Sequence, residues 1–527
     1  MGIQLCVPVC VDAPPIPPGA AGDVSLAAPP APAKRAGLLA STWLLIGWAL
    51  VVGLWIVAEV SPFERCPTHQ SCSTAPVITS GTRIAEWIAV WLAGIVILAL
   101  VRWRDLGVSR LEVIPPVPRR ARWGLMITGS LAAVLAGAHF LLLAPMAKTL
   151  TCAWPIRVNR FMAYPLNCDS PLFMRLAQHP RVLLQYDDPR QSRPGYVAVG
   201  AALTRIIGPV ASRLGLDNAY GQPHSTSYIP LILINLVVAG AAIAVLAWLL
   251  GRFGTPVAIV IALCSLLMLN DLMKAFFWTP HQQMFTLLVP LATITLGRWV
   301  ILRQPSWPIM AMVGFGLGLA SLIYANWLIT VAALALILLL RGRRGVPAAA
   351  VLIAAFAILP LFWTWLCKRL SGSYYNQETA RYHEFIWLPQ SAEKGWRTLQ
   401  GSLEVASVGS MREVLGADAL VIAVLAGLVV AAVWTRVKLK AQSAEDSALL
   451  VASGLTIGLS LLFGWAIGVY ATRIMFAAFP AILVVAGWVG TQFAAKSRVT
   501  LLVATYGLGI VAIANALHEV LVHGPYS

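Results

Sequence analysis

The chain of 527 residues is 59% hydrophobic and only 11% charged, and its mean hydropathy is +0.78. Soluble domains carry about 25% charged residues, so this composition excludes an ordinary soluble protein. The long apolar runs predict an all-α polytopic membrane protein, because a helix satisfies its own backbone hydrogen bonds inside the bilayer.

The net charge of +17 raises the question of a nucleic-acid partner. The arginines, however, fall in short loops between apolar runs rather than along one continuous face. This distribution is typical of the charges that orient membrane proteins, and it leaves some arginines available for phosphate groups. We therefore expect contacts with membrane lipids and no nucleic-acid partner.

Residues 1–36 are rich in proline and alanine and lack periodicity, which predicts a disordered cytoplasmic tail. Two extra transmembrane helices are expected in 37–122, and a transmembrane catalytic core in 123–527. Hydropathy predicts about thirteen spans, about eleven of them in the core. The expected spans are 38–60, 83–101, 123–147, 229–251, 255–270, 283–303, 307–324, 327–340, 346–366, 416–436, 448–470, 474–493 and 499–520.

The lysine and arginine content of the short loops predicts the orientation. Cations recur in alternate short loops, and they also precede the first span at Lys34 and Arg35, so this side is expected to be cytoplasmic. Two long loops, 148–228 and 367–416, and the shorter loop 270–283 then fall outside. We expect a multi-pass protein of the bacterial plasma membrane with a cytoplasmic N-terminus and its catalytic loops outside.

Two pairs of cysteines fall in the expected outer loops. Cys66 and Cys72 share one loop, and Cys152 and Cys168 share another. In an oxidising compartment each pair can form a disulfide, and free thiols are the alternative. No cysteine has the spacing with histidines that is typical of a zinc site.

The first long outer loop begins a helix at residues 169–177, which read DSPLFMRLA. Asp169 or Ser170 is a suitable capping residue, and Pro171 suits a first turn. The apolar residues that follow predict a short amphipathic helix on the membrane surface, with Asp169 at its N-terminal end. A second surface helix is expected over Tyr196–Leu214, and a membrane crossing is the alternative there.

Four charged residues lie between these two helices: Asp187, Asp188, Arg190 and Arg193. The two arginines can hold a phosphate through charge-assisted hydrogen bonds. The alternative is a solvated turn in which the aspartates and arginines pair with each other.

The other two outer loops also contain candidate residues. His281 can face the same cavity as the first loop, or it can be a hydrogen-bonded histidine of the membrane interface. Tyr374, Tyr375 and Arg381 belong to the second long loop. Their aromatic rings suit sugar stacking and equally suit the aromatic belt of a membrane interface.

The order of these features resembles the GT-C fold of integral-membrane glycosyltransferases, in the branch of the protein O-mannosyltransferases and the lipid A aminoarabinose transferases. In that branch an acidic residue opens a surface helix with the pattern D-E-x-x-Y-x-x-x-A, and a segment of the type R-P-P-L-Y opens a second one. Asp169–Ala177 resembles the first pattern, and Arg193–Tyr196 resembles the second. The resemblance extends over most of the chain after residue 122.

Two later segments add to the resemblance. Arg473–Pro480 is a looser form of the pattern R-Y-x-x-P-x-x-P, and Thr279–Phe285 stands at the place of an outer loop of the type T-D-A-x-x-x-F. The chain departs from the branch where Ser170 replaces an acidic residue and where His281 and Gln282 stand near a second acid. A divalent metal, which some relatives use, is therefore left open, and no other cofactor is expected.

The resemblance implies transfer of a sugar from a polyprenyl-phosphate donor to a lipid, glycan or protein acceptor outside the membrane, with inversion at the anomeric carbon. Asp169 is the catalytic base in this hypothesis. Positive charge for the leaving phosphate would come first from Arg473, and then from Arg190 and Arg193. The aspartates of 187–188 would orient the sugar or the acceptor.

Two other classes of function stay open. A multi-pass transporter or lipid flippase would carry paired charges at mid-membrane and internal repeats, whereas the span centres here are mostly uncharged. A polymerase or ligase of surface polysaccharide would also use long outer loops with arginines. In that class the main functional loop comes late in the chain, whereas the densest motif here comes early.

Overall fold

A computed structural model describes residues 127, 153–157, 163–167, 169–185, 188, 190–213, 225–268, 270–376, 379, 385–408, 441, 443–467 and 476–496. Several predictions lie outside these residues. They are the tail, the spans expected before residue 148 (Ile127 excepted) and at 416–436 and 499–520, the two cysteine pairs, and the site candidates Asp187, Arg381 and Arg473.

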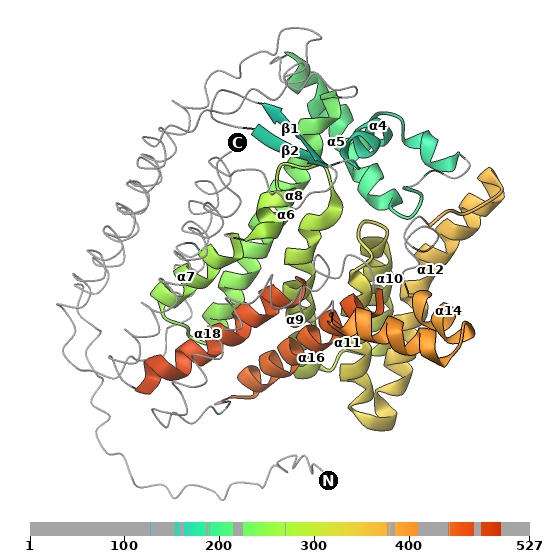
Figure 1. The fold of residues 1–527 in the computed structure, drawn as a ribbon. Helices are drawn as coiled ribbons and strands as arrows, with labels where there is room; N and C mark the ends of the chain where they lie inside the picture. The colour runs from blue at the N-terminus through green and yellow to red at the C-terminus, as the bar shows by residue number, and fades with distance from the viewer. Residues whose placement is uncertain are drawn as a thin grey trace, which may run out of the picture.

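A helix occupies each remaining expected span, so the described part of the chain is a helical protein with membrane-type segments (Figure 1). Five helices are long and apolar enough to cross a membrane, and they lie in Pro194–Arg213, Tyr228–Arg252, Gln282–Arg303, Gly342–Ser371 and Ala444–Ile467. The helices at the expected spans are α6 (Tyr228–Arg252), α7 (Val257–Met268), α9 (Phe285–Arg303), α10 (Trp307–Ser321), α11 (Trp327–Leu339), α12 (Val346–Ser371), α16 (Ala444–Ile467) and α18 (Ala478–Lys496).

The first outer loop forms the two helices that its sequence predicts. α4 covers Ser170–Gln178, and α5 covers Pro194–Arg213. The apolar face of α4, which includes Phe173 and Leu176, is almost completely buried against protein. α5 and the short helical turn at Ser225–Ser227 pack against α4, so protein covers this face, and the position of α4 at a membrane surface stays a prediction. The position of α5 relative to the bilayer stays a prediction.

A small antiparallel hairpin that the sequence did not predict precedes α4. Its strands are β1 (Ala153–Arg157) and β2 (Ala163–Asn167). Pro155 lies opposite Pro165 in the register, so the two missing N–H donors fall on the same rung. Each strand is too short, and too interrupted by proline, to give a clear alternating pattern in the sequence.

The segment 270–283, which the sequence predicts as a short outer loop, is held to α6 by the buried side-chain amide of Asn235. Asn235 Nδ2 lies 3.0 Å from the carbonyl oxygens of Phe276 and Phe277 and 2.8 Å from that of Thr279. These carbonyls follow α8 (Asp271–Phe276). Asn235 therefore fixes the segment that leads to His281, because buried carbonyls need a donor.

The remaining helices complete a bundle around α9, which packs against α6, α11, α16 and α18. One hydrophobic cluster joins the region from α4 to α9 with α16 and α18, and a second joins α9 with α10, α11 and α12. The shorter helical segments are η1 (Pro180–Leu184), η3 (Ser225–Ser227), η4 (Gln282–Met284), η5 (Gly342–Arg344) and α14 (Trp387–Glu393).

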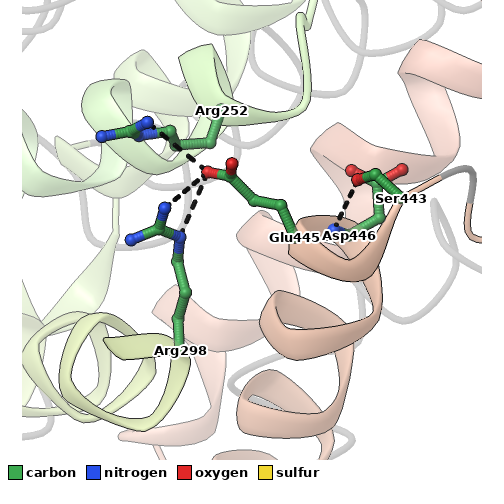
Figure 2. A network of polar contacts seen from close by, with 5 residues as sticks. All are labelled: Arg252, Arg298, Ser443, Glu445 and Asp446. Atoms are coloured by element: carbon green, nitrogen blue, oxygen red, sulfur yellow. Dashed lines mark hydrogen bonds and ion pairs between the residues drawn. The ribbon is translucent and has the colours of Figure 1, made fainter. Parts of the chain in front are cut away.

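The bundle has two chemically different ends. α4, α5 and the hairpin lie at one, here called the site end, at the top of Figure 1. At the other, the far end, Glu445 Oε1 lies 2.8 Å from Arg298 Nη2 and 3.6 Å from Arg252 Nη1 (Figure 2). Both guanidinium groups lie over the Trp248 ring, at 4.7 and 5.5 Å from its centroid. This cluster joins α6, α9 and α16, and its orientation in a membrane stays a prediction.

Helices α10 and α12 approach closely through small residues of the GxxxG type. A Cβ atom added at Gly318 would lie 2.5 Å from the Phe356 carbonyl oxygen, and one at Gly314 would lie 2.4 Å from the Leu352 carbonyl oxygen. Gly316, on the same helix, has open space at the same position.

We expect Gly318→Ala to lower the free energy of unfolding by about 1–3 kcal/mol, because the added methyl group must push the two backbones apart. Gly316→Ala is the matched control. It should leave stability unchanged or raise it by up to ~1 kcal/mol through better helix propensity. Thermal unfolding of the two variants in detergent measures the difference, and equal midpoints would contradict the close packing of α10 on α12.

Candidate functional site

Asp169 stands at the start of α4 but does not use its side chain to cap the helix. Its backbone carbonyl accepts the N–H of Phe173 at 3.1 Å, as a helix start requires. Its carboxylate instead forms an ion pair with Arg190 through Oδ1, and its Oδ2 lies 3.4 Å from His281 Nε2. The expected capping role is thus taken only by the backbone, and the carboxylate is available for chemistry.

Arg190 is buried, with 5% of its surface exposed, and it reaches Asp169 from a tight turn. The turn is held by the Gln191 N–H, which donates to the Asp188 carbonyl at 3.2 Å, and by the Arg193 N–H, which donates to the Arg190 carbonyl at 2.9 Å. The Arg190 guanidinium lies 5.2 Å from the centroid of the Phe173 ring, a cation–π geometry. Paired and stacked in this way, the buried charge is stabilised.

Asp188 shapes the same turn. Its Oδ1 accepts the backbone N–H of Arg190 at 2.9 Å, and its Oδ2 lies 3.4 Å from Arg175 Nη2 on α4. The pairs therefore do not form within the turn, which was the alternative that the sequence left open. Arg175 of α4 pairs with Asp188 of the turn, and Arg190 of the turn pairs with Asp169 at the start of α4. A role for Asp188 in orienting a sugar stays a prediction.

His281 is also buried and lies among aromatic rings. Its ring centroid is 5.8 Å from that of Phe173 and 5.2 Å from that of Phe276. Phe173 in turn makes an edge contact with Tyr196 of α5 at 4.9 Å. The rings form an apolar wall beside the Asp169 carboxylate, so His281 belongs to the same site as Asp169, as one of the two readings of its sequence predicts.

The Asp169 carboxyl is strongly biased toward its charged form. Burial alone would raise its pKa, but the hydrogen bond from His281 and the positive charge of Arg190 outweigh burial and lower the pKa from 3.8 to about 2. The carboxylate is therefore ionised at any physiological pH. It can accept a proton in a reaction only weakly while Arg190 remains paired with it.

Several buried polar atoms around this carboxylate have no hydrogen-bond partner within the described part of the chain. They are Ser170 Oγ, Arg190 Nε, Tyr196 Oη and Gln282 Oε1. Buried polar groups in native proteins are almost always paired. Three of these residues lie next to Asp169 or His281 in the chain or pair with the carboxylate, and Tyr196 packs on Phe173.

The segment that follows α12 meets the turn before α5 through Gln191, a residue that the sequence did not single out. Gln191 is fully buried, and its Oε1 accepts the backbone N–H of Tyr375 at 2.8 Å while its Nε2 donates to the Gln185 carbonyl at 2.7 Å. Trp363 Nε1 of α12 donates to the Gln191 carbonyl at 2.7 Å. Tyr374 and Tyr375 are thereby held near the turn that carries Arg190.

The structure brings together Asp169, Asp188, Arg190 and His281, which the sequence names from separate motifs. It also shows three contributors that sequence reasoning missed: Gln191, Arg175 and Gln283. Gln191 and Gln283 each follow other polar residues, and Arg175 lies alone between Met174 and Leu176, so none of them carries a distinct signal in the sequence. Only the contacts between distant segments identify their roles.

The residues do not fit a dedicated metal site. Within the described residues, no group of three or more His, Cys, Asp or Glu side chains could hold a metal ion. The Asp169 carboxylate is already shared by the Arg190 guanidinium and the His281 ring, which supply positive charge and a donor where a cation would stand. No step below is assigned to a metal.

The low pKa of Asp169 predicts a pH-dependent contribution to stability. Because the folded-state pKa lies below the unfolded value, the contribution is present above about pH 4 and is lost as the pH falls toward about 2. We expect the stability advantage of the wild type over Asp169→Asn to shrink by about 2 kcal/mol over this range. Unfolding midpoints at pH 2 to 7 measure it, and a constant difference would contradict the pairing of the carboxylate.

Gln191→Leu tests the hydrogen bond between the turn before α5 and the segment after α12. Losing the side-chain acceptor should speed hydrogen exchange at the Tyr375 amide by roughly 5-fold, because a typical net hydrogen bond contributes about 1 kcal/mol. Gln400→Leu is the control, since Gln400 is exposed in the same predicted loop as Tyr375. Exchange followed by mass spectrometry should change only in the first variant; protection of Tyr375 in Gln191→Leu would refute this hydrogen bond.

Comparison of the chain with protein-family models, with curated proteins and with solved structures found no match in any of the three searches.

Proposed function

We propose that this protein is a membrane glycosyltransferase that moves a sugar from a polyprenyl-phosphate donor to a lipid, glycan or protein acceptor at the outer face of the membrane. The observation that carries the proposal is the meeting of Asp169, Arg190 and His281 in one buried cluster. These residues belong to separate segments, two of which resemble motifs of one glycosyltransferase branch. Their convergence supports a common role.

The cluster suits the two requirements of inverting sugar transfer. The acceptor hydroxyl forms a new bond to the anomeric carbon as the bond from that carbon to the phosphate oxygen breaks. The hydroxyl proton passes to the Asp169 carboxylate, and the electron pair of the broken bond leaves with the polyprenyl phosphate. In this proposal Arg190 pairs with that phosphate, because its guanidinium already pairs with the Asp169 carboxylate beside the reacting atoms.

Donor binding would also change the basicity of Asp169. Arg190 lowers the pKa of this carboxyl in the resting site. A phosphate that draws the guanidinium away would weaken this effect and return the pKa toward its ordinary value. Asp169 would then become a better base only when the donor is in place, which disfavours wasteful proton transfer in the empty site.

The surroundings leave the Asp169 carboxylate accessible to an acceptor. Its side chain is 29% exposed, whereas the rings of Phe173 and Phe276 are buried beside His281. An acceptor hydroxyl can therefore reach the carboxylate, while the rings pack the site from behind. The site end of an apolar bundle also suits a donor whose lipid tail stays in the bilayer. The predicted thirteen-span topology and outward orientation belong to this proposal.

Labelled polyprenyl-phosphate sugars offered to the purified protein in lipid nanodiscs, with and without membrane acceptor lipids, test the function. The proposal expects acceptor-dependent transfer of label. A transporter or flippase would instead move the donor between leaflets without transfer, and a polymerase would lengthen a saccharide chain.

In the same assay Asp169→Asn should lower turnover by at least about 100-fold, because it removes the proton acceptor. Asp446→Asn is the control; it alters a carboxylate residue at the far end, where its backbone N–H caps α16 through Ser443 (Figure 2). If folded Asp169→Asn protein keeps most of the wild-type turnover, Asp169 is not the catalytic base.

A further inference from the structure

The two ring nitrogens of His281 make different contacts. Nδ1 accepts the backbone N–H of Gln283 at 3.1 Å, so this nitrogen carries a lone pair rather than a proton. In the neutral ring the proton is then on Nε2, which lies 3.4 Å from Asp169 Oδ2. The geometry therefore selects the neutral tautomer that donates to the carboxylate, because a doubly protonated ring would face the Gln283 N–H with a second donor.

The backbone that selects this tautomer is itself held from two sides. Gln283 Nε2 lies 3.1 Å from Thr286 Oγ1 and 3.2 Å from Tyr324 Oη, and these two hydroxyls are 2.7 Å apart. All three side chains are buried. Because Thr286 lies on α9 and Tyr324 lies between α10 and α11, the segment at His281 is tied to the rigid bundle rather than to a loose loop.

We propose that His281 is a positioning residue that orients the Asp169 carboxylate by donating its Nε2–H to Oδ2. This inference rests on the proposed function and refines it. Oδ2 is held by His281, so Oδ1, now paired with Arg190, is the oxygen that receives the acceptor's proton. In this role the imidazole neither binds the sugar nor takes up a proton during turnover.

A neutral donor suits this place better than a second acid would. A carboxylate beside Asp169 would repel it and raise its pKa unless a cation lay between them. The charged groups that face the His281 ring are Asp169 and, through the same carboxylate, Arg190. The ring thus supplies a hydrogen bond without adding net charge, which explains how a chain that departs from the branch at this position can keep an oriented base.

Two substitutions separate the nitrogen atoms of His281. His281→Gln can place an amide N–H near the position of Nε2, whereas His281→Asn places its amide near the position of Nδ1. We expect His281→Gln to keep kcat within about 10-fold of the wild type. His281→Asn and His281→Ala should each lose about 100-fold in kcat with little change in the KM for the donor, since the lost interaction is with the base and not with the donor.

The split between kcat and KM, together with rescue by His281→Gln but not by His281→Asn, is the readout that a merely structural role would not move. Thr293→Val is the stability control. Thr293 lies on α9, and its buried hydroxyl pairs with that of Thr330 on α11 at 2.7 Å.

The outcomes are distinct. No transfer by the wild type with any polyprenyl-phosphate sugar would overturn the proposed function and this inference with it. Transfer by the wild type, with equal kcat losses in His281→Gln and His281→Asn, would overturn the inference alone. A raised donor KM with unchanged kcat in all three variants would also overturn it, because His281 would then bind the donor directly. If Thr293→Val loses as much kcat as His281→Asn does, the loss in His281→Asn reflects lower stability of the protein, which would also overturn the inference.

Discussion

The pairing of buried Arg190 with Asp169 is the constraint on which the site end of this protein depends. A guanidinium buried without a partner costs several kcal/mol, so the turn that carries Arg190 can close only where the start of α4 supplies a carboxylate. The Phe173 ring stabilises the same charge from its face. Through His281, the carboxylate also joins the segment after α8 to this pair. One ionic contact therefore sets both the local fold and the chemistry.

The polar contacts of the bundle are concentrated at its ends. Glu445 joins α6, α9 and α16 at the far end, while Asn235, Gln191 and Gln283 join loops to helices at the site end. Between these ends, helices meet mainly through apolar side chains and close backbone approaches, and the hydroxyl pair of Thr293 and Thr330 also joins α9 to α11. This division is what a bilayer imposes, because polar groups need partners there and apolar helices gain nothing from avoiding lipid. The site can then be rigid although it is made from loops.

Sequence reasoning worked where the signal was local. The apolar runs marked α6 nearly to the residue and the start of α12 at Val346, and Asp169 with Pro171 marked the start of α4. It did not predict the hairpin, whose strands carry one proline each, or the protein that covers the apolar face of α4. An amphipathic helix has the same pattern in either environment, so periodicity cannot distinguish a membrane surface from the surface of a bundle.

The sequence by itself determined the class of molecule, the positions of its described helices and the identity of the charged residues worth attention, because hydropathy and capping depend on neighbours along the chain. Only the tertiary structure decided which charges meet. It shows that His281 lies beside Asp169 and that Asp188 stabilises the turn at Arg190. It also shows that Gln191 connects this turn to the segment after α12. Those choices depend on distances between segments far apart in the chain, and a one-dimensional pattern carries no information about such distances.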